Sequence, residues 1–243
     1  MSKKISLKQF LMKSGKFERA QDCEQAIRNG EVTINSKKIT NPNYFFRVKN
    51  PLVKFENEKL KAIEPLYFLL NKPSGYLSQK SENEKAIYEL IVKTGLEKNI
   101  INSLFAVGRL DKDTEGLMII TNDGKLSDLL MSPKNEIIKK YYLVLEAPAD
   151  KSKITQLEKG IEIKADDGKY RTKPCRIKIT GEKEAYISIS EGKKRQIKLM
   201  FEAIGNKVIY LKRVSIAGIQ LGKLETGEIK KVTKEEIMGK LEF

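Results

Sequence analysis

One carboxylate, Asp111, occupies the part of this chain best suited to chemistry. It lies in the run Gly108–Gly124, GRLDKDTEGLMIITNDG, between a basic turn and the apolar stretch Leu117–Ile120. That stretch has the length and β-branched character of a buried strand, and the glycines of the run let the backbone turn beside it. Loop residues held by a rigid strand often carry function, and an aspartate side chain is normally ionised at neutral pH. The run therefore predicts a reactive carboxylate.

Composition limits the chemistry that can accompany this carboxylate. The chain has 243 residues and no histidine, which excludes Ser-His and Cys-His catalysis and every His-ligated metal site. Cys23 and Cys175 are too few for a zinc site made of cysteines alone, and we expect both to be reduced thiols near the core. No phosphate-loop or dinucleotide glycine motif occurs. We therefore expect chemistry on carboxylates, Lys, Arg, Tyr, Ser or Thr, with no metal and no cofactor.

Charge points to an anionic partner. The formal net charge is +15, although a basic surface can also serve solubility alone. Residues 1–60 hold 13 basic against 6 acidic residues, and residues 61–243 hold 34 against 26. This imbalance predicts a small basic domain, 1–60, followed by a larger domain, 61–243. The basic N-terminus lacks a signal-peptide core, and no stretch approaches the roughly 20 apolar residues of a membrane span. We expect a cytoplasmic protein with no membrane partner.

The hydrophobic pattern of the small domain predicts two helices followed by a hairpin. Apolar residues recur at helical spacing over 7–15 and again over Ala20–Asn29, and each pattern ends at a glycine. Strand-like alternation follows at Val32–Ile34, then a turn, then Lys38–Ile39.

The larger domain is predicted to alternate short strands and helices. It begins after a linker formed by Pro51 and the charged stretch Glu56–Glu64, with an apolar strand at Leu66–Leu70. Further strands are predicted at Tyr142–Leu145, Arg176–Ile179, Ala185–Ile189 and Val208–Leu211. Helices are predicted at Lys125–Met131, Lys151–Lys159, Lys194–Ala203 and Lys234–Leu241. Neighbouring strands without intervening helices favour an α+β fold, with a mixed, mostly antiparallel sheet flanked by helices.

The run around Asp111 resembles the signature GRLDxxTxGLLLxTNDG of bacterial pseudouridine synthases that modify ribosomal RNA. The match covers the whole run and places Asp111 on that family's catalytic aspartate, which outweighs the alternative of an Asp in an ordinary charged turn. Asn71–Gly75, NKPSG, is similar to the motif that opens the family's catalytic domain, and there Pro73 and Gly75 would shape a turn beside the site. The resemblance also implies the family's mixed sheet flanked by helices.

Two later segments extend the resemblance. Lys140–Val144, KYYLV, is similar to the family's K-x-Y-x-V and implies that Tyr142 is the active-site tyrosine. Tyr141 is the flanking alternative, on the opposite face of the strand. Glu191–Phe201 is similar to EGxxxQ[VI][RK]xMF and implies that Lys198 is the cation paired with the catalytic aspartate. Taken singly, a core tyrosine and a basic helix face would be the ordinary interpretations.

These residues account for the reaction that the resemblance implies. Isomerising uridine requires breaking the N1–C1′ bond, turning the uracil and joining C5 to C1′. Asp111 would attack C1′ or assist glycal formation, and Lys198 would fix the carboxylate. Tyr142 would stack on the uracil and take part in proton transfer at C5. A uridine in structured RNA must be extruded to reach the site, and Arg109 would fill the vacated space or hold phosphate, unless it only bridges the loop.

The segment Leu7–Val53 resembles the Alpha-L RNA-binding motif, a small domain shared by a ribosomal small-subunit protein and several RNA-modifying enzymes. The pattern GxVx[IV]N of its core occurs here as Gly30–Asn35, whereas the Arg-Leu-Asp that often opens the motif is replaced by Ser6–Lys8. For each basic residue here, a solvated helix face is the alternative to a phosphate contact. The residues expected to contact RNA, besides Arg109, are Lys13, Lys16, Arg19, Arg28, Arg195 and Gln196.

The resemblance implies a monomeric isomerase whose partner is ribosomal RNA or a subunit assembly intermediate. Asp111–Thr114, Ser132–Lys134 and Ile216–Leu221 are most similar to the branch that acts on 16S small-subunit RNA. Arg195–Gln196 is instead similar to the branch that acts on 23S large-subunit RNA, which is the second candidate. The three motifs argue against a non-catalytic RNA-binding or ribosome-assembly protein, and against a basic module that binds only protein.

Overall fold

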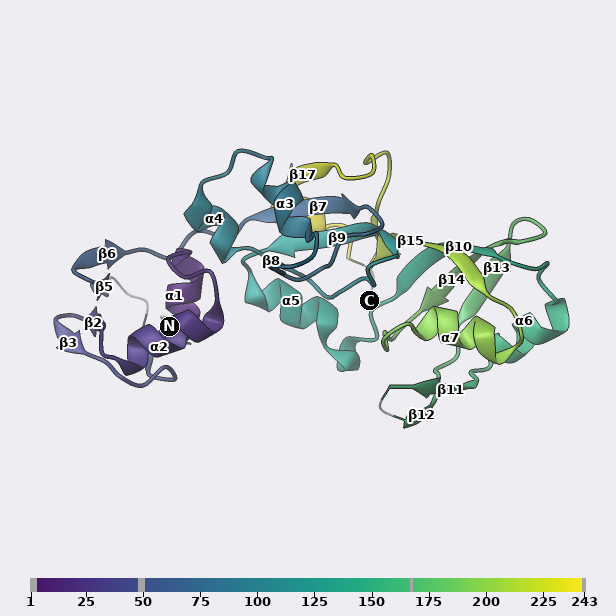
Figure 1. Cartoon of the computed structure of the whole chain (residues 1–243), viewed down its shortest axis with the longest axis horizontal. Coiled ribbons are helices and arrows are strands. Elements are labelled where there is room, and N and C mark those ends of the chain that lie inside the picture. Colours follow the sequence, from purple (N-terminus) through teal and green to yellow (C-terminus); the bar gives the residue numbers. More distant parts are fainter. Residues whose placement is uncertain (1–3, 48–50, 167, 242–243) are drawn as a thin grey trace. The chain divides into compact units, whose positions relative to one another are not determined.

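The computed structural model describes residues 4–47, 51–166 and 168–241. The chain divides into two compact units, whose elements are labelled in Figure 1. The first unit comprises Met1–Leu66 together with Ile91–Phe105, and the second comprises Tyr67–Leu90 together with Ala106–Phe243. Thus the chain leaves the first unit, returns to it and leaves again. Within the described ranges, no helix is long and apolar enough to cross a membrane.

The first unit opens with the two predicted helices. Ser6 and Gln9 form a capping box at the start of α1, and Gly15 ends the helix in the left-handed conformation, at φ 69°. A Cβ atom at Gly15 would lie 1.7 Å from the carbonyl oxygen of Asn99, so only glycine allows α4 to approach this turn. The elements of the unit are β1 (Lys4–Ser6), α1 (Leu7–Ser14), α2 (Ala20–Arg28), β2 (Val32–Ile34), β3 (Lys37–Lys38), β4 (Phe45–Arg47), β5 (Val53–Phe55), β6 (Glu58–Leu60) and α4 (Lys98–Ser103).

Four of these strands form a sheet in the order β3-β2-β5-β6. The predicted hairpin of β2 and β3 is confirmed, but the linker predicted from residue 56 is wrong at its start. Val53 pairs with Leu60 across a tight turn, in which Glu56 and Asn57 have φ angles of 46° and 67°. Val53 and Leu60 lie in the core of the unit. β5 and β6 have only three residues each, and β6 buries only one of them. Strands this short show too little alternation to stand out from the charged residues around them.

The second unit is built on one large mixed sheet, as predicted. Within the described residues its strands follow the order β13-β14-β10-β15-β9-β7-β17, with β16 paired to β15 and β8 to β9. β15 runs parallel to β9, whereas the flanking pairs β10–β15 and β7–β9 are antiparallel. The strands of this sheet are β7 (Tyr67–Lys72), β8 (Phe105–Ala106), β9 (Glu115–Thr121), β10 (Lys139–Leu145), β13 (Arg176–Ile179), β14 (Glu184–Ile189), β15 (Val208–Ile216), β16 (Ile219–Gln220) and β17 (Ile229–Val232). A separate two-stranded sheet is formed by β11 (Glu162–Ala165) and β12 (Gly168–Arg171). The helices of the unit are α5 (Gly124–Met131), α6 (Lys151–Glu158), α7 (Gln196–Ala203) and α8 (Lys234–Met238), and it also contains the 3-10 turn η1 (Pro133–Asn135). Helix α3 (Ile87–Val92) crosses the boundary between the units.

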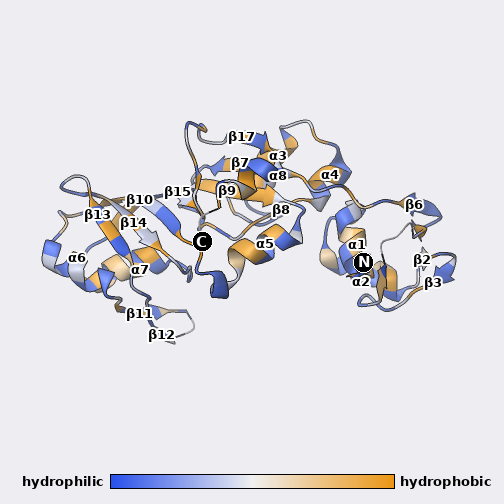
Figure 2. Ribbon diagram, turned by 180° about the vertical axis from the view of Figure 1, so that it is seen from behind, coloured by the Kyte–Doolittle hydropathy of each residue, from blue (hydrophilic) through white to orange (hydrophobic). Residues whose placement is uncertain are grey.

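The interior strand β9 is mostly apolar and buried, and Figure 2 colours it hydrophobic. The turn after it is fixed by Asp123, which accepts a hydrogen bond from the N–H of Lys125 at 3.0 Å and caps α5. The hydroxyl of Tyr67, on the neighbouring strand β7, donates to the same carboxylate at 2.8 Å. Burial and this hydrogen bond raise the pKa of Tyr67 to about 12. The predicted strand and turn after the Asp111 loop are thus confirmed as a rigid support for that loop.

The part of the sheet formed by β13, β14, β10 and β15 has two different faces. On one face the side chains are buried: Tyr141, Leu143, Ala185, Ile187, Leu211 and Arg213. Helix α7 contacts β15 and helix α6 contacts β13 (Figure 1). On the other face the side chains are half-buried or exposed: Lys140, Tyr142, Val144, Tyr186, Tyr210, Lys212 and Val214. We call these the helix-covered face and the open face.

Candidate active site

The loop that carries Asp111 is held in place by hydrogen bonds to its backbone. The buried hydroxyl of Ser78 donates to the carbonyl oxygen of Leu110 at 2.7 Å and accepts from the N–H of the same residue at 2.9 Å. The N–H of Thr114 donates to the carbonyl oxygen of Asp111 at 3.1 Å. The half-buried carboxylate of Asp111 therefore projects from a turn that is fixed on both sides. Ser78 was missed at the sequence level, because a single serine carries no motif.

Lys72, from the NKPSG segment, lies directly against this loop. Its ammonium is fully buried and donates to the carbonyl oxygens of Pro73 at 2.9 Å and Lys112 at 3.1 Å. The N–H of Gly75 donates to the same Lys112 carbonyl at 2.8 Å. Burial lowers the pKa of Lys72 from 10.5 to about 8, and nearby carboxylates, Asp111 among them, oppose the shift. The segment shapes a turn, as predicted, and also supplies a buried cation that the prediction missed.

Lys198 lies at the site, but its ion pair is with Asp113. The distance from Nζ to Oδ2 is 2.5 Å, and the lysine side chain is 9% exposed whereas the aspartate side chain is 66% exposed. Burial alone would raise the pKa of Asp113, but the hydrogen bond and charge of Lys198 lower it. The expected partner, Asp111, stands two positions earlier in the same loop. The structure does not show the predicted pairing of Lys198 with Asp111, which stays a prediction.

Two further cations are buried behind the loop. Arg213 is 2% exposed, and its Nε donates to the carbonyl oxygen of Leu117 at 2.7 Å, while its Nη2 has no hydrogen-bond partner among the described residues. Gly116 lies opposite Arg213 in the parallel pair of β9 and β15, where a Cβ would stand 2.2 Å from the Arg213 carbonyl oxygen. Lys139 is also buried, and burial together with the charge of Arg213 lowers its pKa, an effect that Glu191 opposes. Arg213 and Lys139 thus add two buried cations to Lys72 and Lys198.

The two candidate tyrosines lie on opposite faces of β10. Tyr141 is buried on the helix-covered face and pairs across β10–β15 with Arg213, which in turn lies opposite Gly116. Tyr142 is on the open face and pairs with Lys212. Because α7 lies on the helix-covered face and carries Lys198, the structure brings Tyr141 and not Tyr142 to the side of the sheet that holds Lys198.

The start of α7 is held by side-chain hydrogen bonds. Gln196 is buried, and its Nε2 donates to Glu191 at 2.5 Å, while its Oε1 accepts from the N–H of Lys193 at 2.9 Å. The hydroxyl of Tyr170 donates to the same glutamate. The side chain of Arg195 is exposed, and its backbone has the left-handed conformation, at φ 55°. Its Nη2 lies 3.5 Å from Oε1 of Glu202. The structure therefore uses Gln196 to position the helix and leaves Arg195 at the surface.

The other residues expected to contact RNA lie at the surface. Arg109, beside Asp111, is exposed. In the first unit, Lys13 is half-buried and Arg19 is exposed. The ammonium of Lys16 forms an ion pair with Glu58, and Arg28 lies 4.0 Å from Glu24. Exposed ion pairs of this kind are weak and can be exchanged for phosphate contacts. The RNA-binding role of these residues stays a prediction.

The site thus combines a carboxylate on a rigid turn with buried cations and an aromatic ring on one side of a sheet. Such an arrangement can hold an anionic substrate and carry out nucleophilic chemistry on it. A family model described as RNA pseudouridylate synthase matches residues 66–203, more than half of the chain. The protein is therefore an enzyme of the class that isomerises uridine in RNA.

Individual relatives of known sequence and one solved structure are similar to this chain over most of its length. The chain is 33% identical to YtzG, an uncharacterized RNA pseudouridine synthase of Bacillus subtilis, over 96% of this chain and 97% of the relative. It is 35% identical to ribosomal large subunit pseudouridine synthase B of Bacillus subtilis, with coverage of 88% and 87%. It is 33% identical to ribosomal small subunit pseudouridine synthase A of Vibrio cholerae, with coverage of 89% and 91%. A crystal structure of a pseudouridylate synthase matches with a TM-score of 0.68 at 31% identity, covering 96% of this chain and 98% of the other. The chain belongs to the RNA pseudouridylate synthase family.

Proposed function

We propose that this enzyme converts one specific uridine of 16S small-subunit ribosomal RNA to pseudouridine. The observation that best supports this proposal is the position of Asp111, in a loop that Ser78 and the NKPSG segment hold beside the buried cation Lys72. The segments Ser132–Lys134 and Ile216–Leu221 favour the small-subunit branch. A relative named for the small subunit, at 33% identity, adds support.

Large-subunit 23S RNA is the second candidate substrate. It is supported by the Arg195–Gln196 form of the α7 motif and by the 35% identity to a synthase named for the large subunit. Either substrate would place the enzyme in the cytoplasm with ribosomal RNA or an assembly intermediate as its partner. We propose that the enzyme is a monomer.

In the proposed reaction Asp111 is the nucleophile. Its carboxylate attacks C1′ of the extruded uridine, and the N1–C1′ bond breaks with the electron pair leaving on the uracil. After the uracil turns, C5 bonds to C1′ and the carboxylate is released. A proton then leaves C5 and one is taken up at N1. Lys198 and the other buried cations stabilise the negative charge that develops on the uracil, in a site where burial strengthens electrostatics.

We propose Tyr141 as the aromatic group of the reaction centre, in place of Tyr142. The support is its place on the helix-covered face, in register with Arg213 and Gly116. The ring would stack on the extruded uracil, and its hydroxyl would assist proton transfer at C5. The same K-x-Y-x-V pattern fits one residue earlier, from Lys139 with Leu143 in place of valine.

We further propose that the first unit is an Alpha-L-type RNA-binding domain that positions the ribosomal RNA. Its support is the helix-helix-hairpin order of α1, α2, β2 and β3, and its excess of basic residues.

The substrate is tested by mapping pseudouridines in 16S and 23S RNA from cells with and without this gene. One 16S position should lose its pseudouridine in the deletion strain and regain it with the wild-type gene but not with Asp111→Asn. Loss at a 23S position instead would replace the small-subunit proposal by the large-subunit one. Unchanged modification in both RNAs would contradict a ribosomal substrate.

A further inference from the structure

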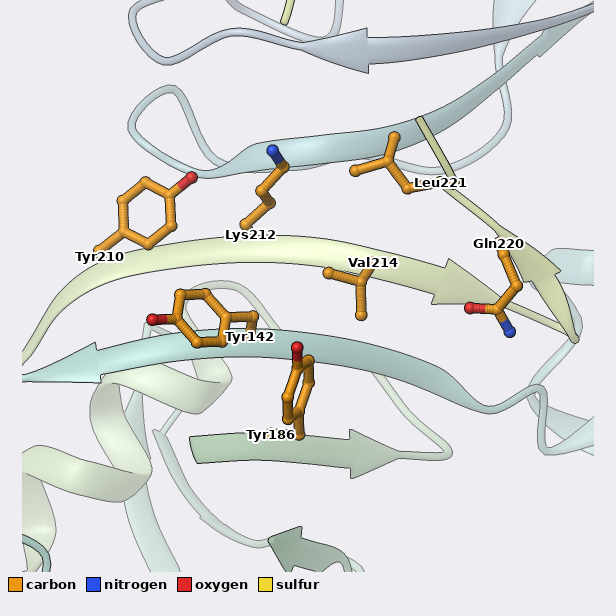
Figure 3. A pocket seen from close by; sticks show the side chains of 8 residues that line it. Tyr142, Tyr186, Tyr210, Lys212, Val214, Gln220 and Leu221 are labelled. Atoms are coloured by element: carbon orange, nitrogen blue, oxygen red, sulfur yellow. The ribbon is translucent and has the colours of Figure 1, made fainter. Parts of the chain in front are cut away.

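A cluster of tyrosines lies on the open face of the sheet, which α7 and Lys198 do not cover. Tyr142, Tyr186 and Tyr210 come from the adjacent strands β10, β14 and β15 and line a pocket of about 500 Å³ together with Lys212 (Figure 3). The ring centroid of Tyr142 lies 5.5 Å from that of Tyr186 and 6.1 Å from that of Tyr210. All three residues are half-buried, so part of each one's surface remains open to a ligand. A pocket of this volume admits a small ligand such as a nucleoside.

Basic side chains surround these rings. The Nζ of Lys140 lies 4.8 Å from the ring centroid of Tyr186, and Lys178 stands opposite Tyr186 in the pair β13–β14. Lys212 lines the pocket, and Arg176 is exposed two residues before Lys178 on the same face. In the part of the chain that the structure describes, none of these four cations forms an ion pair. Their charge is therefore available to an anionic ligand.

Two acidic side chains on this face, Glu115 and Glu184, are already engaged. Glu115 accepts a hydrogen bond from the hydroxyl of Tyr210 at 2.7 Å. Glu184 is hydrogen-bonded to Tyr142. Both carboxylates thus fix tyrosine rings instead of neutralising lysines, which leaves four cations against two satisfied anions. Charge complementarity favours a polyanion over an apolar protein surface.

We propose that this open face binds unpaired nucleotides of RNA. Bases would stack on the tyrosine rings while Lys140, Lys178 and Lys212 hold the phosphates. Aromatic rings flanked by cations on a sheet are how proteins bind single-stranded nucleic acid with little sequence preference, because every base offers a π face. A base entering over Tyr186 would displace the ammonium of Lys140 from the ring toward the neighbouring phosphate. The site lies beyond the reaction centre, so it would grip RNA flanking the target and not the target itself.

The test is binding of a fluorescein-labelled ten-nucleotide oligouridylate to the full chain, measured by anisotropy over a salt series. Tyr186→Leu removes a stacking ring and should weaken binding by about fivefold or more, whereas Tyr186→Phe keeps the ring and should bind like wild type. Lys178→Gln should reduce the slope of log K against log salt by about 0.7. The matched control Lys164→Gln, an exposed lysine on β11, should leave that slope unchanged.

If both Tyr186→Leu and Lys178→Gln bind with wild-type affinity and a wild-type slope of log K against log salt, the proposal is overturned. A protein partner would then be the alternative occupant of this face. Circular dichroism checks the fold of Tyr186→Leu, and the exposed Lys178→Gln decides the matter if that variant does not fold. The proposal is separable from the proposed function, because the oligonucleotide needs no isomerisation to bind. If the variants lose oligonucleotide affinity but ribosomal RNA is not modified by the wild-type enzyme, only the proposed function is contradicted.

Discussion

The ammonium of Lys198 is bound by Asp113, at 2.5 Å from Nζ to Oδ2, although Asp111 lies two positions earlier in the same loop. The lysine is almost fully buried, whereas the aspartate side chain is mostly exposed. Taking Asp113 away would leave a buried charge without its partner, which is costly. The pair therefore keeps the cation of the site in place while the carboxylate of Asp111 is left for substrate.

Asp111→Asn should abolish pseudouridine formation and leave RNA affinity within a few-fold of wild type. The amide keeps the shape of the side chain and loses its nucleophilicity. Asp113→Asn makes the same change two residues away. It leaves Lys198 without its partner and should lower turnover without abolishing it, because the nucleophile remains. Single-turnover assays on ribosomal RNA make the comparison. Equal loss in the two variants would show that the loop contributes charge and not one nucleophile.

Lys198→Ala should lower turnover by about 100-fold, in the range typical of removing one preorganised electrostatic group. RNA affinity should change far less, because the ammonium is buried behind the loop. Lys198→Arg keeps the charge and should be milder. Normal turnover of both variants at saturating RNA would show that Lys198 only balances the charge of Asp113.

Tyr141→Leu should reduce turnover much more than Tyr142→Leu. The first change removes the ring on the helix-covered face, beside Arg213, and the second removes a ring from the open face. The comparison is made at saturating RNA, where a change in RNA affinity does not contribute to the rate. A larger loss for Tyr142→Leu would return the active-site role to Tyr142.

Lys72 should give the protein an unusual alkaline stability profile. Burial lowers its pKa in the folded state to about 8, against the ordinary value of 10.5. Between these two pH values the unfolded chain binds more protons than the folded chain, so the free energy of unfolding should rise with pH. Lys72→Met should remove this slope, and the exposed control Lys159→Met should keep it. Urea denaturation from pH 8 to 10.5 measures both, and identical slopes in wild type and Lys72→Met would contradict the assignment.

The first unit should contribute to RNA binding through its basic residues. Truncation is a poor test, because removing α1 would uncover α4, so substitutions are preferable. The triple variant Lys13→Gln, Arg19→Gln and Arg28→Gln should reduce the slope of log affinity against log salt by about 0.7–0.9 for each phosphate that the variant no longer binds. Binding to a ribosomal RNA fragment over a salt series provides the measurement. An unchanged slope would mean that these residues do not touch this RNA.

The long motif and the large sheet were predictable because they depend on local pattern. The apolar run Leu117–Ile120 is long enough to identify β9, and β13 matches its predicted bounds, Arg176–Ile179. The short strands β5 and β6 were not predictable in the same way, since charged residues are as frequent as apolar ones there. β5 pairs with β2, an interaction that local sequence does not contain, and β6 is joined to the sheet by its pairing with β5.

The site shows the same limit in the choice of tyrosine. Lysine and tyrosine are each doubled at Lys139–Tyr142, so the motif fits in two frames that differ by one residue. A shift of one residue moves a side chain to the opposite face of a strand. Only the register of β10 with β15, and the position of α7, shows which face holds Lys198. Lys72 was missed for a related reason, because its burial depends on a loop forty residues away.

The return of residues 91–105 to the first unit sets an order for folding during synthesis. The ribosome makes the chain from its N-terminus, and domains generally fold as units as they emerge. Because α4 packs at the turn of Gly15, the first unit is not complete until β7 and α3 have already been made. β9 and β17, the partners of β7, are made only later. When α4 docks, it closes residues 67–90 into a loop anchored at both ends on a folded body. The first strand of the catalytic sheet therefore waits for its partners as a tethered segment and not as a free nascent end.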